Sequence, residues 1–154
     1  MAETDLIKLY SQRILALAAD IPHAERLDAP HGTASKRSPL CGSVVTVDVA
    51  LEREKIADLG MDVKACALGQ ASSSVLGAAA IGLSRAQIQA GRDALYAMMK
   101  EGAPAPTTGP FTALEALVPA KDYKNRHASI MLAWEALLEA MDQAARPAAA
   151  DAAR

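Results

Sequence analysis

Residues 45–52, Val-Thr-Val-Asp-Val-Ala-Leu-Glu, decide the fold because their side chains alternate between apolar and polar along the chain. This period of two is typical of a strand with one buried face. We expect a second short strand over 55–59, a turn at Gly60 and a third strand over 61–66. Three short consecutive strands favour an antiparallel meander, so the sheet is expected within residues 41–66.

The chain before this sheet is expected to hold one helix and one long connection. Thr4 is a candidate helix cap, and Leu6, Tyr10 and Leu17 recur at helical spacing, which predicts a helix over 4–19. Residues 22–40 are rich in Pro, Gly, Ser and His and show no sustained period, so they are interpreted as a connecting loop.

The chain after Cys66 has helical patterns almost to its end. Ser84 and Gln87 match a capping box, and Gly102 is placed to end the helix that they open. We expect helices over 70–81, 84–101, 111–119 and from about 126 to 145, and a disordered tail over 147–154. Strands followed by helices predict an α+β fold, with a small three-stranded antiparallel sheet packed against several helices in one domain over 1–146.

Composition limits the classes of function. The 154 residues carry a formal net charge of −2, and no basic stripe with interleaved aromatic residues is present, so no nucleic-acid partner is expected. No apolar run approaches the roughly 20 residues of a membrane span, so no membrane partner is expected either. The acidic start, Met1 to Asp5, differs from a basic signal peptide, and a cytoplasmic protein is therefore expected.

The two cysteines lie at predicted element boundaries. Cys41 falls in a turn between Pro39 and Gly42, just before the first expected strand, and Cys66 ends the third strand just before a helix. A thiol at a helix N-terminus has a lowered pKa, and the thiolate is the form that binds metals. In a meander, the start of the first strand and the end of the third can meet at one end of the sheet. Two inert core thiols remain the alternative.

Three segments carry a resemblance to a known family. Residues 38–43, Ser-Pro-Leu-Cys-Gly-Ser, resemble an Asn-Pro-x-Cys-Gly-Asp loop, and residues 64–74, Lys-Ala-Cys-Ala-Leu-Gly-Gln-Ala-Ser-Ser-Ser, resemble a Gly-Cys pair that precedes an Ala-Ser-rich helix. Residues 114–117, Leu-Glu-Ala-Leu, and 126–137, Arg-His-Ala-Ser-Ile-Met-Leu-Ala-Trp-Glu-Ala-Leu, are similar to the corresponding SufU segments. Over about residues 36–140 the chain resembles the IscU/NifU-type iron–sulfur cluster assembly scaffolds, in their SufU-like branch.

The resemblance implies a ligand set that is incomplete in this chain. Cys41 and Cys66 fall on cluster cysteines, whereas Ser43 occupies the position of a ligand aspartate and Ser129 that of a third cysteine. A serine hydroxyl is a poor ligand for a soft metal, and iron–sulfur clusters are held mainly by four thiolates. His127, two residues before Ser129, is a candidate supplementary metal ligand, because imidazole suits zinc and iron. A histidine at the surface near a helix N-terminus is the alternative.

The resemblance also implies the function. It implies a scaffold rather than an enzyme, which holds iron or a [2Fe–2S] cluster, takes sulfur from a cysteine desulfurase and supplies apo iron–sulfur client proteins, with a homo-oligomer as one way to complete the ligand set. Two alternatives stay open. One is a cluster-less homologue that modulates a cysteine desulfurase, and the other is a zinc-bound sulfur-transfer partner.

Overall fold

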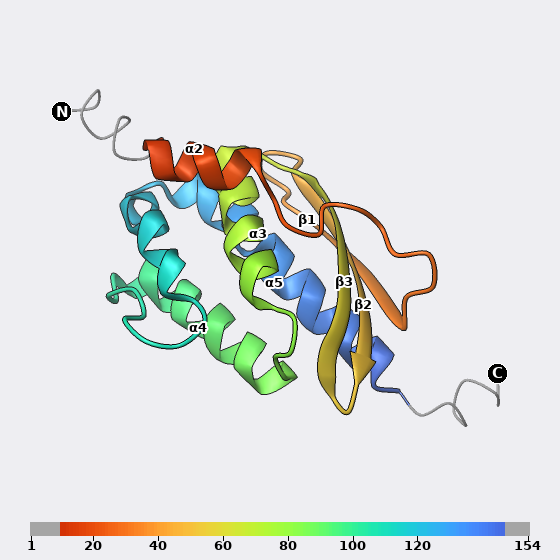
Figure 1. Cartoon of the computed structure of the whole chain (residues 1–154). Coiled ribbons are helices and arrows are strands. Elements are labelled where there is room, and N and C mark those ends of the chain that lie inside the picture. The colour runs from red at the N-terminus through yellow and green to blue at the C-terminus, as the bar shows by residue number, and fades with distance from the viewer. Residues whose placement is uncertain (1–9, 147–154) are drawn as a thin grey trace.

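The computed structural model describes residues 10–146, and its sheet has three antiparallel strands in the order β1-β2-β3 (Figure 1). The strands are β1 Gly32–Arg37, β2 Val44–Glu52 and β3 Lys55–Lys64. The alternation that predicted β2 is confirmed, since Val45, Val47 and Val49 are completely buried on the face that packs against a helix. The predicted α+β class, with a small antiparallel sheet and several helices, is therefore confirmed.

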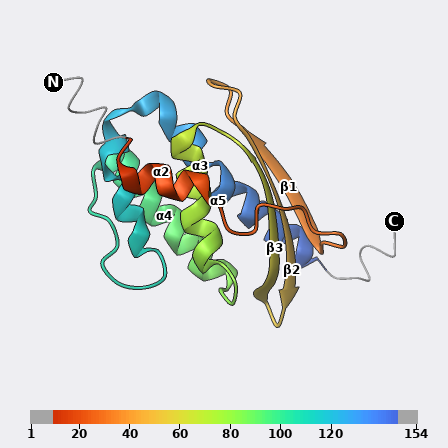
Figure 2. The ribbon, with the colours of Figure 1, turned by 45° about the horizontal axis from the view of Figure 1, so that its top comes forward.

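The helices form a layer that covers one face of this sheet. In chain order they are α2 Gln12–Ala19, α3 Ala67–Ala79, α4 Arg85–Glu101, the 3₁₀ helix η1 Thr112–Asp122 and α5 Lys124–Ala144. Helix α5 packs directly on β1 and β2, while α3 packs on α5 and α2 packs on α3 (Figures 1 and 2). Helix α4 packs against α5, and η1 packs against α3, α4 and α5. None of the helices within residues 10–146 has the length and apolar content of a membrane span.

Helix α5 is the centre of the core because it has neighbours on several sides. The predicted stripe is buried as expected, and it consists of Ile130, Trp134, Leu137, Leu138 and Met141. The Trp134 ring lies edge-on to Phe111, with 4.7 Å between the ring centroids. Burying one such large apolar side chain contributes about 1.5–3 kcal/mol to folding, so this helix holds the sheet and the other helices together.

The predicted start of the sheet is wrong. Residues 22–40 are not only a loop, because 32–37 form β1, which pairs with β2 from Gly32↔Val49 to Arg37↔Val44. The sequence Gly-Thr-Ala-Ser-Lys-Arg lacks large β-branched residues because α5 passes very close to it. A Cβ at Gly32 would lie 2.1 Å from the carbonyl oxygen of Ala140. Small residues are therefore required there, and they hide the strand pattern.

Residues 55–64 form one strand, whereas two strands with a turn at Gly60 were predicted. The chain turns instead at Arg53 and Glu54, whose φ angles of +54° and +65° suit a two-residue hairpin connection. Gly60 has another role, because a Cβ there would lie 2.3 Å from the carbonyl oxygen of Glu25. Because glycine has no side chain, the backbone at Glu25 can cross β3 closely at this point.

The helix boundaries are mostly those predicted. The Ser84–Gln87 capping box is present, and Gly102, with φ +68°, ends α4. Within the described residues the first helix begins only after its cap, Ser11, while Thr4 and the predicted tail over 147–154 lie outside them. Pro119 does not close the helix after Phe111, because a 3₁₀ helix continues through it to Asp122.

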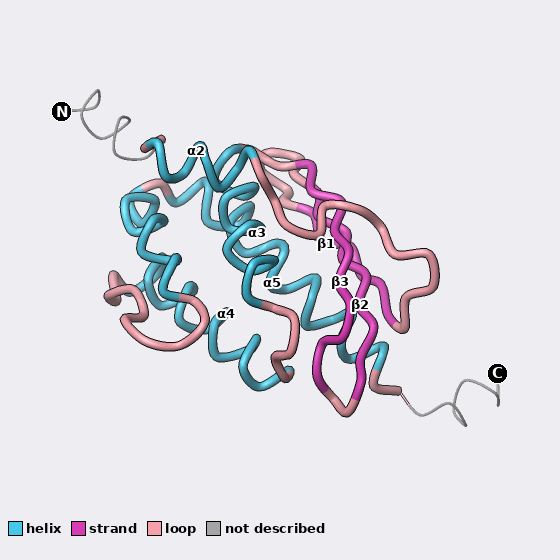
Figure 3. Tube along the Cα trace, viewed as in Figure 1, coloured by secondary structure: helices cyan, strands magenta, loops and turns pink. Residues whose placement is uncertain are grey.

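Asp48 fixes the loop of residues 22–31, drawn in pink after α2 in Figure 3, to the outer face of the sheet. Its carboxylate has no solvent exposure and accepts hydrogen bonds from Arg26 Nε at 2.6 Å, Leu27 N at 3.0 Å and Thr33 Oγ1 at 2.6 Å. Burial alone would raise the pKa of Asp48, but these hydrogen bonds lower it below its ordinary value. The carboxylate is therefore kept charged.

Candidate metal and cluster site

Strand pairing brings the two cysteine segments to the same end of the sheet. The loop of residues 38–43 connects β1 to β2, and Val44, the first residue of β2, pairs with Lys64, the last residue of β3. Cys66 follows Lys64 by two residues. The expectation that both cysteines lie at one end of the sheet is confirmed, although they belong to neighbouring strands rather than to the first and third.

The loop of residues 38–43 is a closed turn that presents Cys41 to solvent. Ser38 N donates to the carbonyl oxygen of Ser43 at 2.8 Å, and Gly42 N donates to that of Ser38 at 3.0 Å. Gly42 has a φ of +73°, which glycine adopts without strain. The Ser38 side chain is completely buried beneath the turn, whereas Cys41 is exposed.

The Cys41 sulfur lies between two hydroxyl groups. It is 3.4 Å from Ser38 Oγ and 3.0 Å from Ser43 Oγ. Hydrogen bonds from Ser38, and then from the side chain and backbone of Ser43, lower the pKa of the Cys41 thiol to about 7. A large fraction of Cys41 is therefore thiolate at neutral pH, and the thiolate is the nucleophilic and metal-binding form.

Cys66 lies near the same group of side chains, at the start of α3. It is the N-cap residue of that helix, its side chain makes no capping hydrogen bond, and its sulfur lies 3.6 Å from Ser129 Oγ on α5. Ser129 Oγ in turn donates to Ser43 Oγ at 3.1 Å. The structure therefore joins the four positions of the predicted ligand set in a continuous series of contacts, from Cys41 through Ser43 and Ser129 to Cys66.

The register of α3 against α5 is held by one buried serine. Ser72 Oγ donates to the carbonyl oxygen of Ile130 at 2.7 Å and accepts a hydrogen bond from Trp134 Nε1 at 3.0 Å. One turn earlier, Gly69 leaves room for Ser129, since a Cβ there would lie 2.7 Å from Ser129 Oγ. These contacts place the start of α3 beside Ser129.

The structure does not bring His127 to the two cysteines. The ring is buried, and Nε2 lies 3.1 Å and 3.0 Å from the carbonyl oxygens of Ala120 and Lys121. Both partners are acceptors, so Nε2 carries the proton, while Nδ1 is buried without a hydrogen-bond partner among the described residues. Burial lowers the pKa of His127 and keeps the ring neutral. An offset of two residues turns a side chain by roughly 200° around a helix, away from Ser129.

The side chains that are present fit a soft metal in part. Two thiols suit iron and zinc, but the neutral hydroxyls of Ser43 and Ser129 do not replace thiolates. Within residues 10–146, no group of three or more His, Cys, Asp or Glu side chains is placed to hold a metal ion. Sequence reasoning missed Ser38 as a contact of Cys41, although it lies in the same motif.

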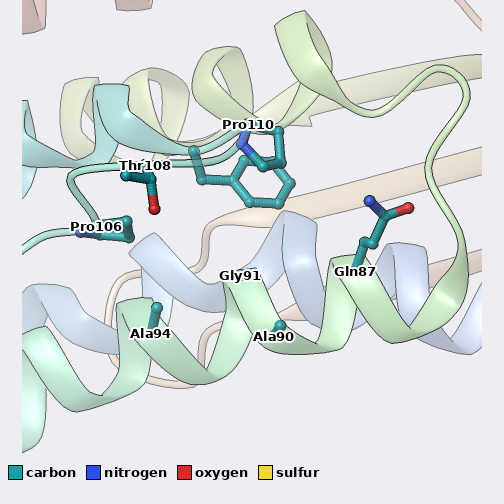
Figure 4. Close-up of a pocket in the computed structure, with 8 residues that line it drawn as sticks. Gln87, Ala90, Gly91, Ala94, Pro106, Thr108 and Pro110 are labelled. Atoms are coloured by element: carbon teal, nitrogen blue, oxygen red, sulfur yellow. The ribbon is translucent and has the colours of Figure 1, made fainter.

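A hollow elsewhere on the surface carries no comparable chemistry. It measures about 280 Å³ and lies between α4 and the loop that precedes η1, where Ala90, Gly91 and Ala94 face Pro106 and Pro110 (Figure 4). None of the residues that line it has a titratable side chain. This hollow therefore offers no chemistry comparable to that of the cysteine cluster, which consists of Cys41, Ser43, Cys66 and Ser129 and is the candidate functional site.

Comparison with known proteins supports the same interpretation. Residues 9–146 match the family model described as the NifU-like N terminal domain. The chain is 28% identical over 145 residues to the iron–sulfur cluster assembly scaffold protein IscU of Streptococcus pyogenes serotype M1, a match that covers 94% of this chain and 90% of the relative.

Solved structures show the same fold. The N-terminal part of a NifU-like protein from Brucella abortus superposes with a TM-score of 0.87 at 40% identity, over 91% of this chain and 96% of that chain. A scaffold protein described for the SUF system of Fervidobacterium islandicum AW-1 superposes with a TM-score of 0.76 at 23% identity, over 88% of this chain and 98% of that chain. The latter likeness shows the fold alone.

Proposed function

Because this chain belongs to the NifU-like N-terminal domain family, which includes iron–sulfur cluster assembly scaffolds, we propose that it assembles a cluster as cargo and passes it on. It would receive iron and sulfide, hold a labile [2Fe–2S] cluster through Cys41 and Cys66, and release it to an apo-protein. The protein would act as a scaffold rather than as an enzyme.

The observation that carries this proposal is the series of contacts between the two cysteines. Each sulfur touches a serine hydroxyl, at 3.0 Å for Cys41 with Ser43 and 3.6 Å for Cys66 with Ser129, and the two hydroxyls touch each other. Two thiols on separate elements therefore face one small region. With only two thiolates of the usual four, ligation would be weak, which suits a cluster that must leave.

The proposed partners follow from the family. A cysteine desulfurase would supply sulfur, and apo iron–sulfur proteins would take the cluster. Within residues 10–146 neither cysteine takes part in a disulfide bond, and the proposal needs both as reduced thiols. A reducing compartment such as the cytoplasm is therefore proposed as the place of action.

Anaerobic reconstitution tests the proposal. The purified chain would be incubated with ferrous iron, cysteine, a desulfurase and dithiothreitol, which reduces persulfide sulfur to sulfide. Visible charge-transfer absorption would be recorded for the wild type and for a Cys41→Ser, Cys66→Ser double variant. We expect absorption from the wild type alone, and equal absorption from both proteins would refute the role of these cysteines. Urea unfolding of the two metal-free proteins controls for loss of fold.

Zinc is a second candidate for the metal held at this site, favoured by the lowered pKa of the Cys41 thiol and by the suitability of thiolates for zinc. The chain would then act as a zinc-bound sulfur-transfer partner. Metal analysis after purification without chelators separates the two proposals, because a zinc content well below one equivalent excludes this one. A protein that holds neither metal but still binds the desulfurase would match the cluster-less alternative, which Ser43 and Ser129 motivate.

A further inference from the structure

Strand β1 has an unpaired edge that leads to the loop of Cys41. In the three-stranded sheet of residues 10–146, the order β1-β2-β3 gives β1 a strand neighbour on one side alone. Ser38 N donates to the carbonyl oxygen of Ser43, and these two residues stand opposite each other when the β1–β2 register is continued. Such hydrogen-bonded pairs alternate along an antiparallel ladder with pairs whose backbone groups point outward. The backbone groups of residues 33, 35 and 37 therefore point away from β2.

The hydrogen bonds of the chain agree with this alternation and show which part of the edge is covered. Thr33 N donates to Gln143 Oε1 on α5 at 3.3 Å. No hydrogen bond outside the β1–β2 ladder uses the backbone of Ser35 or Arg37 within the described part of the chain, and both residues are exposed. Residues 35–37 are therefore called the open edge, where two N–H groups and two C=O groups have no partner in the described chain.

The other edge of the sheet, on β3, is covered in part by the chain itself. Met61 N donates to the carbonyl oxygen of His23 at 2.8 Å, and Ile56 N donates to that of Leu83 at 2.9 Å. An edge without such partners can bind another extended segment through main-chain hydrogen bonds. The open edge of β1 is therefore suited to an additional strand.

On the basis of the proposed function, we infer that the open edge binds an extended acidic segment of the apo-protein that takes the cluster. The ligand segment of an apo-protein is rarely preformed before its metal arrives, so it is available as an extended chain. Main-chain hydrogen bonds hold such a segment with little regard to its side chains. This mode of binding suits a scaffold that supplies more than one client.

Position and charge both favour this occupant. Arg37 directly precedes Ser38, whose Oγ lies 3.4 Å from the Cys41 sulfur, so a segment paired with residues 35–37 continues toward the loop that presents Cys41. Lys36 is paired with Glu139 at 3.3 Å, whereas Arg37 forms no ion pair among residues 10–146. Opposite charges on directly paired residues stabilise a sheet, so an acidic residue opposite Arg37 is favoured.

A second copy of the chain is the other candidate occupant, and its charges oppose binding. The antiparallel register of two β1 edges that uses every open group pairs Ser35 with Arg37 of the second copy. This register places Lys36 directly opposite Lys36 of the second copy, and like charges in such positions are destabilising. A register centred on Ser35 would need Thr33 N, which already donates to Gln143.

Two-dimensional NMR of the isotope-labelled, metal-free chain tests the inference without a cluster. The probe is the peptide acetyl-Thr-Glu-Thr-Glu-Thr-amide, and acetyl-Thr-Lys-Thr-Lys-Thr-amide is its matched control. With the acidic peptide, the amide protons of Ser35 and Arg37 should shift downfield and exchange more slowly, whereas those of Ala34 and Lys36, which face β2, should keep their exchange rates. The acidic peptide should bind roughly fivefold more tightly than the lysine peptide, as exposed ion pairs would give.

Three variants sharpen the test. Ser35→Pro removes one open N–H and leaves the β1–β2 ladder intact, because an edge strand tolerates proline where the N–H faces solvent. Ser35→Ala is the matched control, since it loses the same hydroxyl and keeps the N–H. We expect peptide-induced shifts in Ser35→Ala and none in Ser35→Pro. Arg37→Glu keeps every backbone group and should reverse the preference in favour of the lysine peptide, so it tests the inference even if Ser35→Pro fails to fold.

Cluster transfer identifies the occupant. The Ser35→Pro and Ser35→Ala chains would be loaded with cluster and mixed with the apo form of a [2Fe–2S] ferredoxin. We expect equal loading, and transfer roughly fivefold slower from Ser35→Pro, as the loss of one hydrogen bond would give. Equal transfer rates, or amide shifts absent with both peptides, overturn the inference and leave the proposed function standing.

Two other results also decide between the possibilities. Slower loading with unchanged transfer would assign the open edge to the sulfur donor, and a dimer joined through β1, detected by sedimentation, would assign it to a second copy. Either result overturns the inference. If the Cys41→Ser, Cys66→Ser double variant loads as well as the wild type, the proposed function fails, whatever the peptides do.

Discussion

Gly69→Ala gives a test in which helix propensity and packing predict opposite changes in the free energy of unfolding. Gly69 is the third residue of α3 and is buried. In an unobstructed helix, replacing glycine with alanine stabilises by about 1 kcal/mol. Here the new Cβ would lie 2.7 Å from Ser129 Oγ, 2.8 Å from Ala65 Cβ and 3.2 Å from the carbonyl oxygen of Ser129.

The packing effect should exceed the propensity effect. The contacts with Ser129 Oγ and Ala65 Cβ are shorter than atoms tolerate. Neither atom is the far end of a long flexible side chain, so neither can move away easily. Forcing an extra carbon into such a site costs about 1–3 kcal/mol, and the propensity gain of about 1 kcal/mol offsets part of this cost, so we expect a net loss of up to about 2 kcal/mol. The start of α3 should move away from α5, which separates Cys66 from Ser129.

Urea unfolding of the metal-free protein at pH 7 measures this loss as a lower midpoint with an unchanged slope. Ala78→Gly is the matched control, because Ala78 is exposed in the same helix and reports propensity alone, with an expected loss of about 1 kcal/mol. A Ser129→Ala, Gly69→Ala double variant should regain part of the stability. A higher midpoint for Gly69→Ala than for the wild type would refute the packing argument.

Three further perturbations follow from the hydrogen bonds. Asp48→Asn should cost about 2–3 kcal/mol at pH 7 in urea unfolding, because charge-assisted bonds to a buried carboxylate are lost. Since the folded pKa of Asp48 is lowered, its contribution is present above the ordinary carboxyl pKa and disappears as pH falls through the folded value. In a Cys66→Ser background, alkylation of Cys41 should reach half its maximal rate near pH 7, and Ser43→Ala should shift that midpoint upward. Ser72→Ala should cost about 1–3 kcal/mol by leaving Trp134 Nε1 unpaired, measured by tryptophan fluorescence during unfolding.

Each of these three predictions has an outcome that would contradict it. Equal urea midpoints for the wild type and Asp48→Asn at pH 7, or a difference that persists unchanged in strong acid, would contradict the role of the carboxylate. An alkylation midpoint that Ser43→Ala leaves in place would show that the hydroxyl does not stabilise the thiolate. Ser72→Thr keeps the hydroxyl and controls for its loss, and a Ser72→Ala protein as stable as the wild type would contradict the bridging role.

The sequence predicted the elements in which large apolar side chains mark the buried face. Strand β2 alternates cleanly because α5 covers one of its faces, and α5 shows a clear stripe because its large residues fill the core. Strand β1 escaped prediction because a close backbone forces Gly32 and Ala34 into its buried positions. Periodicity detects a buried face through large side chains, so an edge strand built from small residues leaves no such signal.

The site was predictable in part for a similar reason. Cys41 and Cys66 stand at element boundaries, and their position at the same end of the sheet follows from strand pairing. Asp48 lies on what the alternation marks as the polar face, and only the fold shows that Arg26, 22 positions away, covers it. The orientation of His127 depends on the carbonyl groups of η1, which no local pattern reveals.

The geometry of the site does not depend on the identity of its ligands. Ser43 is placed by the backbone hydrogen bond from Ser38 and by the pairing of Val44 beside it, and Ser129 is placed by the contacts of α5 with Gly69 and Ser72. Contacts within the chain therefore hold Ser43 and Ser129 beside the two cysteines. Serine at positions 43 and 129 therefore offers only weak donors to a soft metal, while the arrangement around the two cysteines is kept. A cysteine at position 129 would have the same neighbours, Ser43 and the Cys66 sulfur.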